Sequence, residues 1–213
     1  MLPEGSFATL ANGFQFHYHD GGQGDVVLFL HGSGTGASGF TNFKKNIDFF
    51  QRNGFRTIVP DLPGYGFSDK PEDEIYTMSF FNNLLIELLD HLNITNCSVV
   101  GNSLGGALAM GLSLEQPNRF SKLILMAPGG LEDFNAYQEM PGIKKLLGDF
   151  LGGEMNQEKI EGLLKLFPYD PSFVTKDIIE DRMQILPLMN QQVLASMDIP
   201  NLSEKLKNNQ NFF

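Results

Sequence analysis

The chain has 213 residues, enough for one sizeable hydrophobic core or for a core domain with a small appendage. A hydrophobic fraction of 42% indicates a globular protein, and the formal net charge of −10 argues against a nucleic-acid-binding or anionic-membrane surface. No apolar stretch is long enough to cross a bilayer, and a single cysteine, Cys97, excludes an intrachain disulfide, so we expect a cytoplasmic location.

The amino-terminal residues predict a β-hairpin. Ser6–Leu10 and Phe14–His19 have the pattern of two strands, and Asn12-Gly13 between them is the strongest short hairpin signal. His17 and His19 lie on one side of the second strand, a spacing that could ligate a metal. Because no third ligand accompanies them, we expect a solvated strand face and no metal site.

A glycine-rich segment, His31–Gly39, follows the apolar run Val26–Leu30, which is typical of a strand buried on both faces. One interpretation is a dinucleotide fingerprint, because Gly34–Gly39 has the spacing Gly-x-Gly-x-x-Gly and the acidic Asp61 follows the next strand. The other is a loop that faces a nucleophilic serine and helps to bind an oxyanion. We favour the second, because the first glycine comes late after the strand and the first interpretation leaves the serine motif described next unexplained.

The most informative motif is Gly101-Asn102-Ser103-Leu104-Gly105-Gly106, between an apolar run and a helical one. A tight turn from a strand into a helix pushes the Ser103 hydroxyl out of the surface and requires glycine at the crowded positions beside it. The N–H of Leu104, at the start of the helix, is placed to stabilise an oxyanion. The motif therefore predicts that Ser103 is a nucleophile; the alternative is an ordinary turn between a strand and a helix.

Strands and helices alternate from residue 26 onward, which predicts a mostly parallel sheet covered by helices on both faces. Residues 1–130 are predicted to form this α/β core, 131–200 a helical cap or lid, and 201–213 the start of a return to the core. The predicted elements are strands at Val26–Leu30, Arg56–Pro60, Cys97–Gly101 and Lys122–Ala127, the last predicted to be buried, and helices at Thr41–Gln51, Ser79–Leu92 and Leu104–Gln116. Cap helices are predicted between Ile143 and Met197, with one apolar stripe at Ile143, Leu146, Leu147 and Phe150 and another at Ile160, Leu163, Leu164 and Phe167.

These motifs together resemble the α/β-hydrolase superfamily and, within it, the meta-cleavage product hydrolases, which cleave a C–C bond in 2-hydroxy-6-oxo-dienoate ring-fission products of aromatic degradation. The resemblance implies an α/β-hydrolase fold with an inserted helical cap. The segments that show it are His31–Gly36, Phe40–Phe43, Asp61–Asp69, Gly101–Gly106, Lys122–Gly130 and Leu166–Asp170, with Arg182.

The resemblance also implies the roles of individual residues. Ser103 is the nucleophile, and the N–H groups of Ser33 and Leu104 form the oxyanion hole. Asn42, Asn102 and Arg182, with Gly32 and Gly34, bind the substrate, and the planar guanidinium of Arg182 suits a carboxylate. No cofactor or metal is implied, the partner is a small-molecule substrate, and the full-length form is expected to be a homo-oligomer.

This sequence departs from the family pattern in one respect. In the family, the catalytic acid and histidine of the triad lie further along the chain, after additional sheet strands. None of the four histidines fits that role, so we expect a hydrolase sequence that is truncated at its carboxyl end, with C-terminal strands missing and reduced or no activity. The alternatives are a carboxylesterase of the same fold, a nicotinamide-dependent oxidoreductase, and a non-catalytic fragment that only binds a ligand or a sister subunit.

Overall fold

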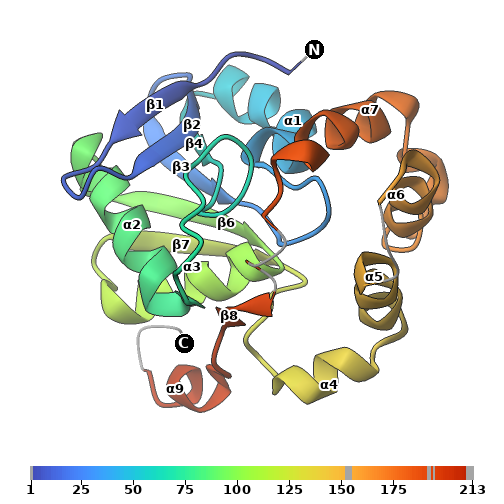
Figure 1. The fold of residues 1–213 in the computed structure, drawn as a ribbon. Helices are drawn as coiled ribbons and strands as arrows, with labels where there is room; N and C mark the ends of the chain where they lie inside the picture. The colour runs from blue at the N-terminus through green and yellow to red at the C-terminus, as the bar shows by residue number, and fades with distance from the viewer. Residues whose placement is uncertain (1, 152–154, 191–192, 194, 210–213) are drawn as a thin grey trace.

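A six-stranded sheet lies at the centre of the computed structural model, which describes residues 2–151, 155–190, 193 and 195–209 (Figure 1). The strand order is β1-β2-β4-β3-β6-β7; β4, β3, β6 and β7 run parallel, and the β1–β2 hairpin joins β4 antiparallel. This arrangement confirms the predicted hairpin and parallel sheet. The strands are β1 (Ser6–Thr9), β2 (Gln15–Gly21), β3 (Asp25–Leu30), β4 (Phe55–Pro60), β6 (Cys97–Asn102) and β7 (Phe120–Met126).

Helices cover both faces of this sheet. Alternate residues of a strand point to opposite faces, so Leu28 and Leu30 of β3 pack into the larger core with α2 (Met78–His91) and α3 (Leu104–Glu115). Phe29 packs into the smaller core under α1 (Gly39–Arg52). The Ser38 side chain begins α1 by accepting a hydrogen bond from the N–H of Thr41.

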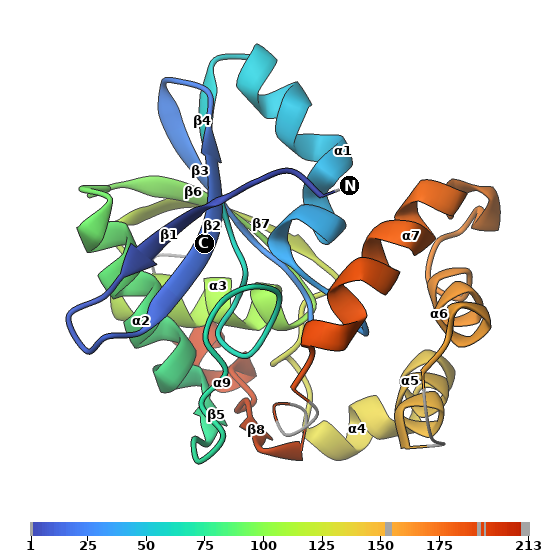
Figure 2. The ribbon, with the colours of Figure 1, turned by 45° about the horizontal axis from the view of Figure 1, so that its top comes forward.

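After β7 the chain forms a series of short helices that arch away from the sheet, and α7 returns alongside α1 (Figures 1 and 2). Ile160 and Leu163 of the predicted apolar stripe on α6 are buried, whereas the side chains of Leu146, Leu147 and Phe150 lie outside the described residues. These elements are α4 (Phe134–Glu139), α5 (Pro141–Leu151), α6 (Gln157–Leu164), η1 (Pro171–Phe173), α7 (Lys176–Ile185) and η2 (Leu186–Leu188).

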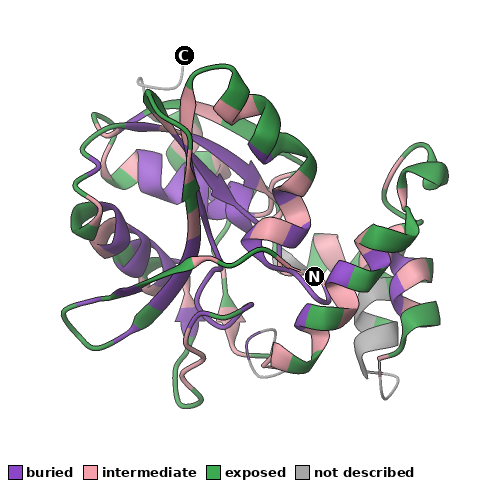
Figure 3. Ribbon diagram, turned by 90° about the horizontal axis from the view of Figure 1, so that it is seen from above, coloured by how far each residue is buried: buried purple, intermediate pink, exposed green. Residues whose placement is uncertain are grey.

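The chain meets the core again through β8 (Met197–Asp198), which pairs in parallel with β5 (Tyr76–Thr77). Leu202 is buried and donates its N–H to the carbonyl of Gly130, just ahead of α9 (Ser203–Lys207). In Figure 3 the buried residues gather in the sheet and the helices against it, while the helices after β7 carry exposed, intermediate and buried residues side by side. In the described part of the chain, no helix combines the length and apolar character that crossing a membrane requires.

The prediction that strand 122–127 is buried is wrong. Ile124, Leu125 and Met126 of β7 are 49%, 38% and 44% exposed. The reason is their place at the edge of the sheet, where β7 pairs with β6 and with no other described strand. Apolar composition predicted burial, but burial also needs a neighbour on the outer side.

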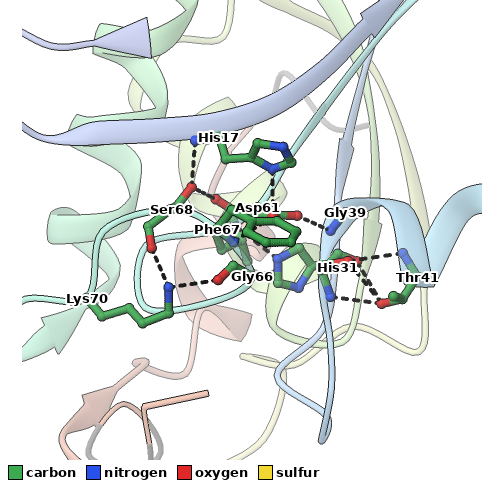
Figure 4. Close-up of polar contacts among 11 residues, drawn as sticks. His17, His31, Gly39, Thr41, Asp61, Gly66, Phe67, Ser68 and Lys70 are labelled. Carbon is green, nitrogen blue, oxygen red and sulfur yellow. Dashed lines mark hydrogen bonds and ion pairs between the residues drawn. The ribbon is translucent and has the colours of Figure 1, made fainter. Parts of the chain in front are cut away.

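The predicted solvated face of His17 is also wrong, because the loop after β4 covers it. His17 is 4% exposed, and its Nδ1 lies 2.8 Å from Oδ2 of Asp61 (Figure 4). Asp61 also accepts hydrogen bonds from the N–H groups of Gly39 at 2.7 Å and Phe67 at 3.0 Å. Burial raises the pKa of Asp61, but the contacts with His17 and Phe67 outweigh burial and hold that pKa below its usual value.

A second buried histidine, His31, joins the ends of β3 and β4. Its Nε2 accepts a hydrogen bond from the N–H of Leu62 at 2.9 Å, so its Nδ1 holds the proton and donates to the carbonyl of Gly32 at 2.8 Å. Burial lowers the pKa of His31 from 6.5 to about 4. The side chain is therefore neutral in the folded protein at neutral pH.

Helix α3 crosses β3 at very short range through Gly105. A Cβ at this position would lie 2.0 Å from the carbonyl oxygen of Leu30 and 2.8 Å from that of His31. Only glycine lets the start of α3 approach the end of β3 this closely.

We predict that the protein loses stability as the pH falls from 6.5 to 4. In this range His31 of the unfolded chain binds a proton that the folded chain does not, which costs at most about 3 kcal/mol of unfolding free energy. Urea unfolding at pH 7, 5.5 and 4 measures the loss. The variant His31→Asn starts less stable but should lose less over this range; an equal loss in both proteins would contradict the assignment.

We also predict that Gly105→Ala destabilises the fold by more than about 3 kcal/mol, because backbone must move to admit the Cβ. Gly162→Ala is the matched control: Gly162 is exposed within α6 with no atom near its Cβ position, so alanine should stabilise the helix by about 0.5–1 kcal/mol. Thermal unfolding compares the two variants, and equal midpoints would be evidence against the close crossing.

Candidate active site

Ser103 occupies a strained turn between β6 and α3. Its backbone has φ 52° and ψ −114°, a conformation that costs a residue with a side chain on the order of 1–3 kcal/mol. Hydrogen bonds hold the turn from both sides: the Ser103 N–H donates to the carbonyl of Met126 at 3.0 Å, and the Ser103 carbonyl accepts from Gly129 at 2.9 Å. The predicted tight turn is confirmed, and Ser103 is partly exposed on it.

The glycines around Ser103 are required by close contacts. A Cβ on Gly101 would lie 2.4 Å from the carbonyl oxygen of Gly105, and one on Gly106 would lie 2.7 Å from Cβ of Pro128. The turn can therefore form only where these positions lack side chains.

The glycine-rich loop after β3 lies directly against this turn. The N–H of Gly105 donates to the carbonyl of His31 at 3.1 Å, and a Cβ on Gly32 would lie 3.1 Å from Cβ of Ser103. Ser33 follows Gly32, and within the described part of the chain neither its N–H nor that of Leu104 donates a hydrogen bond. Two backbone donors near the serine hydroxyl are the arrangement that an oxyanion requires.

Three predicted substrate-binding residues are joined in one hydrogen-bonded series. Arg182 Nη2 donates to Oδ1 of Asn42 at 2.8 Å, and Nδ2 of Asn42 donates to Oδ1 of Asn102 at 3.1 Å. Asn102 precedes Ser103 and is fixed by its own bond to the carbonyl of Met126 at 3.1 Å. The series therefore connects α7 and α1 to the residue beside the serine. Gly34 also lies nearby, since its Cβ position is 3.9 Å from Nη1 of Arg182.

The charge of Arg182 has no carboxylate partner among the described residues. Its Nη1 donates to the carbonyl of Thr35 at 3.3 Å, and its buried Nε has no hydrogen-bond partner. Burial lowers the pKa of Arg182 to about 10, so the guanidinium remains cationic at neutral pH. A partly buried cation that no described carboxylate neutralises favours binding of an anionic group.

The geometry disfavours the dinucleotide-binding interpretation of the same loop. Asp61, which would have to contact a ribose, is 1% exposed and already accepts hydrogen bonds from His17, Gly39 and Phe67 (Figure 4). The Cβ position of Gly36 lies 2.5 Å from the carbonyl oxygen of Arg182, so α7 occupies the side of the loop that a pyrophosphate would need.

None of the four histidines contacts the Ser103 hydroxyl. Both ring nitrogens of His31 are hydrogen-bonded to backbone, and His17 is paired with Asp61 of the loop after β4. His19 lies partly buried on β2, and His91 is exposed in the last turn of α2. The described residues therefore hold the serine and the predicted oxyanion donors without a histidine hydrogen-bonded to the serine hydroxyl.

Sequence analysis missed an ion-pair cluster between α1 and α7. Lys44 Nζ lies 2.6 Å from Oδ2 of Asp177 and 2.6 Å from Oδ2 of Asp181. The i, i+4 spacing of the two aspartates indicates that they share one helix face, but the lysine that they meet is more than a hundred residues away.

Known proteins resemble this chain over most of its length. The 2-hydroxy-6-oxo-6-phenylhexa-2,4-dienoate hydrolase of Burkholderia cepacia is 38% identical over 171 residues, which are 79% of this chain and 59% of that protein. The 2-hydroxy-6-oxononadienedioate/2-hydroxy-6-oxononatrienedioate hydrolase of Comamonas testosteroni is 37% identical, over 79% of this chain and 59% of that protein. The chain thus spans less than two thirds of these relatives' length.

Solved structures show the same architecture. A variant of the meta-cleavage product hydrolase CumD from Pseudomonas fluorescens IP01, complexed with acetates, matches with a TM-score of 0.76 and 28% identity, over 98% of this chain and 70% of that one. An esterase from Exiguobacterium antarcticum matches with a TM-score of 0.76 and 22% identity, over 97% of this chain and 78% of that one. At this identity the match shows the fold alone.

The family model described as the alpha/beta hydrolase fold matches residues 25–158, which include the parallel strands, the serine turn and the glycine-rich loop. The sheet order, the strained serine between β6 and α3, and this match agree with one another. The chain therefore belongs to the α/β-hydrolase fold family.

Proposed function

We propose that this chain carries the nucleophile and the carboxylate-binding residues of a serine-type hydrolase that cleaves a C–C bond in 2-hydroxy-6-oxo-dienoates. The observation that supports it best is the series from Arg182 through Asn42 to Asn102, which ends beside Ser103. A simple ester hydrolase needs the serine but has no use for a partly buried cation there. The names of relatives at 36–38% identity agree with this substrate class.

In this proposal the two ends of the substrate meet different groups. Arg182 binds the carboxylate at one end, and the side-chain amides of Asn42 and Asn102 contact the neighbouring oxygen. The 6-oxo group lies against Ser103, where the N–H groups of Ser33 and Leu104 stabilise negative charge on its oxygen. After a proton shift to the ketone, the Ser103 oxygen attacks C6, the C5–C6 bond breaks, C5 takes up a proton and 2-hydroxypenta-2,4-dienoate leaves. Water then hydrolyses the acyl-serine to the carboxylic acid and frees the hydroxyl.

We further propose that residues 131–200 act as the lid of this site. Helix α7 already brings Arg182 to the glycine-rich loop, and Leu166, Phe167 and Phe173 expose apolar surface that can enclose the substituent of a ring-fission product. The domain limits, a homo-oligomeric full-length form and a cytoplasmic location stay predictions.

Ser103→Ala should abolish hydrolysis of 2-hydroxy-6-oxo-6-phenylhexa-2,4-dienoate, with a loss of about 10⁴-fold or more, because the nucleophilic oxygen is removed. Loss of the dienoate absorbance measures the rate in this chain and in any longer product of the same gene. Short-chain aryl esters are the control substrates. If the active form hydrolyses the esters but leaves the dienoate intact, the protein is an esterase.

Arg182→Met should weaken binding of 2-oxopentanoate, a stable 2-oxo acid, by roughly a hundredfold, since the carboxylate loses its only charged partner. Arg182→Lys retains the charge but not the planar guanidinium, so its affinity for 2-oxopentanoate should lie between those of the wild type and Arg182→Met. Calorimetry on the 213-residue chain measures the three affinities. Binding by Arg182→Met that equals the wild type would show that the carboxylate lies elsewhere.

A further inference from the structure

The cluster of Lys44, Asp177 and Asp181 joins the lid to the core at the helices that hold the substrate-binding residues. Lys44 follows Asn42 by two positions on α1, and Asp181 directly precedes Arg182 on α7. Figures 1 and 2 show α7 lying along α1. The ion pairs therefore act on the same two helices as the Arg182–Asn42 hydrogen bond.

The central pair of this cluster is shielded from solvent. The side chains of Lys44 and Asp181 are 16% and 13% exposed, whereas that of Asp177 is 61% exposed. Burial lowers the pKa of Lys44, but the hydrogen bonds to the two aspartates more than offset this effect and raise that pKa. Exposed ion pairs contribute little to structure, but a shielded cation with two carboxylates is held more firmly.

Besides these ion pairs, α7 meets the loop after β3 through Arg182. Gly36 packs against the Arg182 backbone, and Arg182 Nη1 reaches the carbonyl of Thr35 only at 3.3 Å. A small displacement of α7 would break this bond and the one to Asn42, because hydrogen bonds weaken steeply with distance and angle.

We propose that Lys44 is a positioning residue: by holding Asp181 and Asp177 it fixes α7 on α1 and keeps the Arg182 guanidinium at Asn42, beside the serine. Lys44 itself does not contact the substrate in this arrangement. The role of Arg182 in binding a carboxylate rests on the proposed function, but the docking of α7 by Lys44 does not.

The experiment compares Lys44→Met, Lys44→Arg and the control Arg52→Met in the 213-residue chain. Arg52 pairs with Asp48 on α1 itself, so its removal takes one cation from the same helix without touching α7. Hydrogen exchange of the α7 amides reports the docking, with α3 as an internal reference, and calorimetry with 2-oxopentanoate reports the position of Arg182.

Lys44→Met should exchange faster in α7 but not in α3 and should bind 2-oxopentanoate about tenfold more weakly, because Arg182 is displaced rather than removed. Lys44→Arg should restore most of the exchange protection of α7 and most of the affinity, and Arg52→Met should match the wild type in both measurements. The proposal is overturned if α7 of Lys44→Met exchanges at the wild-type rate, or if Arg52→Met loses as much protection and affinity as Lys44→Met.

Two further comparisons keep the test decisive. If Lys44→Met also raises exchange in α3, the chain has lost its fold, and Asp181→Asn is tested in its place, because it removes the charge of the shielded partner and keeps its size. Unchanged exchange in α7 of Asp181→Asn would then overturn the proposal. If the wild type does not bind 2-oxopentanoate, or Arg182→Met binds it equally well, the carboxylate site is wrong. Exchange in α7 then decides the role of Lys44 by itself.

Discussion

The close approach of three backbone segments is the constraint on which the site depends. The end of β3, the end of β6 and the start of α3 meet at Gly101 and Gly105, where a Cβ would lie within 2.4 Å of neighbouring backbone. The strained turn at Ser103 follows from this crowding, because the chain must reverse from strand to helix with no room for side chains beside it. The same contact brings the loop after β3 to the serine, so the fold and the placement of the two proposed oxyanion donors have one cause.

The sequence was sufficient for the elements whose formation depends on near neighbours. The Asn12-Gly13 hairpin, the buried run at Val26–Leu30 and the serine turn all have local causes, and each lies where it was predicted. Burial was predicted wrongly where it depends on distant segments. His17 is buried by a loop more than forty residues away, and β7 is exposed because no described strand lies outside it.

The candidate site shows the same division. The motif around Ser103 predicted a nucleophile by its spacing, whereas the substrate-binding roles of Asn42, Asn102 and Arg182 were predicted through family resemblance alone. No local pattern could place Arg182 against Asn42, since 140 residues separate them and the contact depends on how α7 packs on α1. The Lys44 cluster escaped prediction for this reason, although its two aspartates share a helix face.

The open edge of β7 lies one strand away from the serine turn, since Gly101 and Asn102 pair with Leu125 and Met126. A strand that joined the sheet there in parallel would end at the same side of the sheet as β6, about 5 Å beyond β7. Residues that followed such a strand would approach Ser103 from the side of β7, where the described residues place no general base. An element that paired with this edge would therefore also lie beside the Ser103 turn, so pairing at the edge and access to the serine are linked.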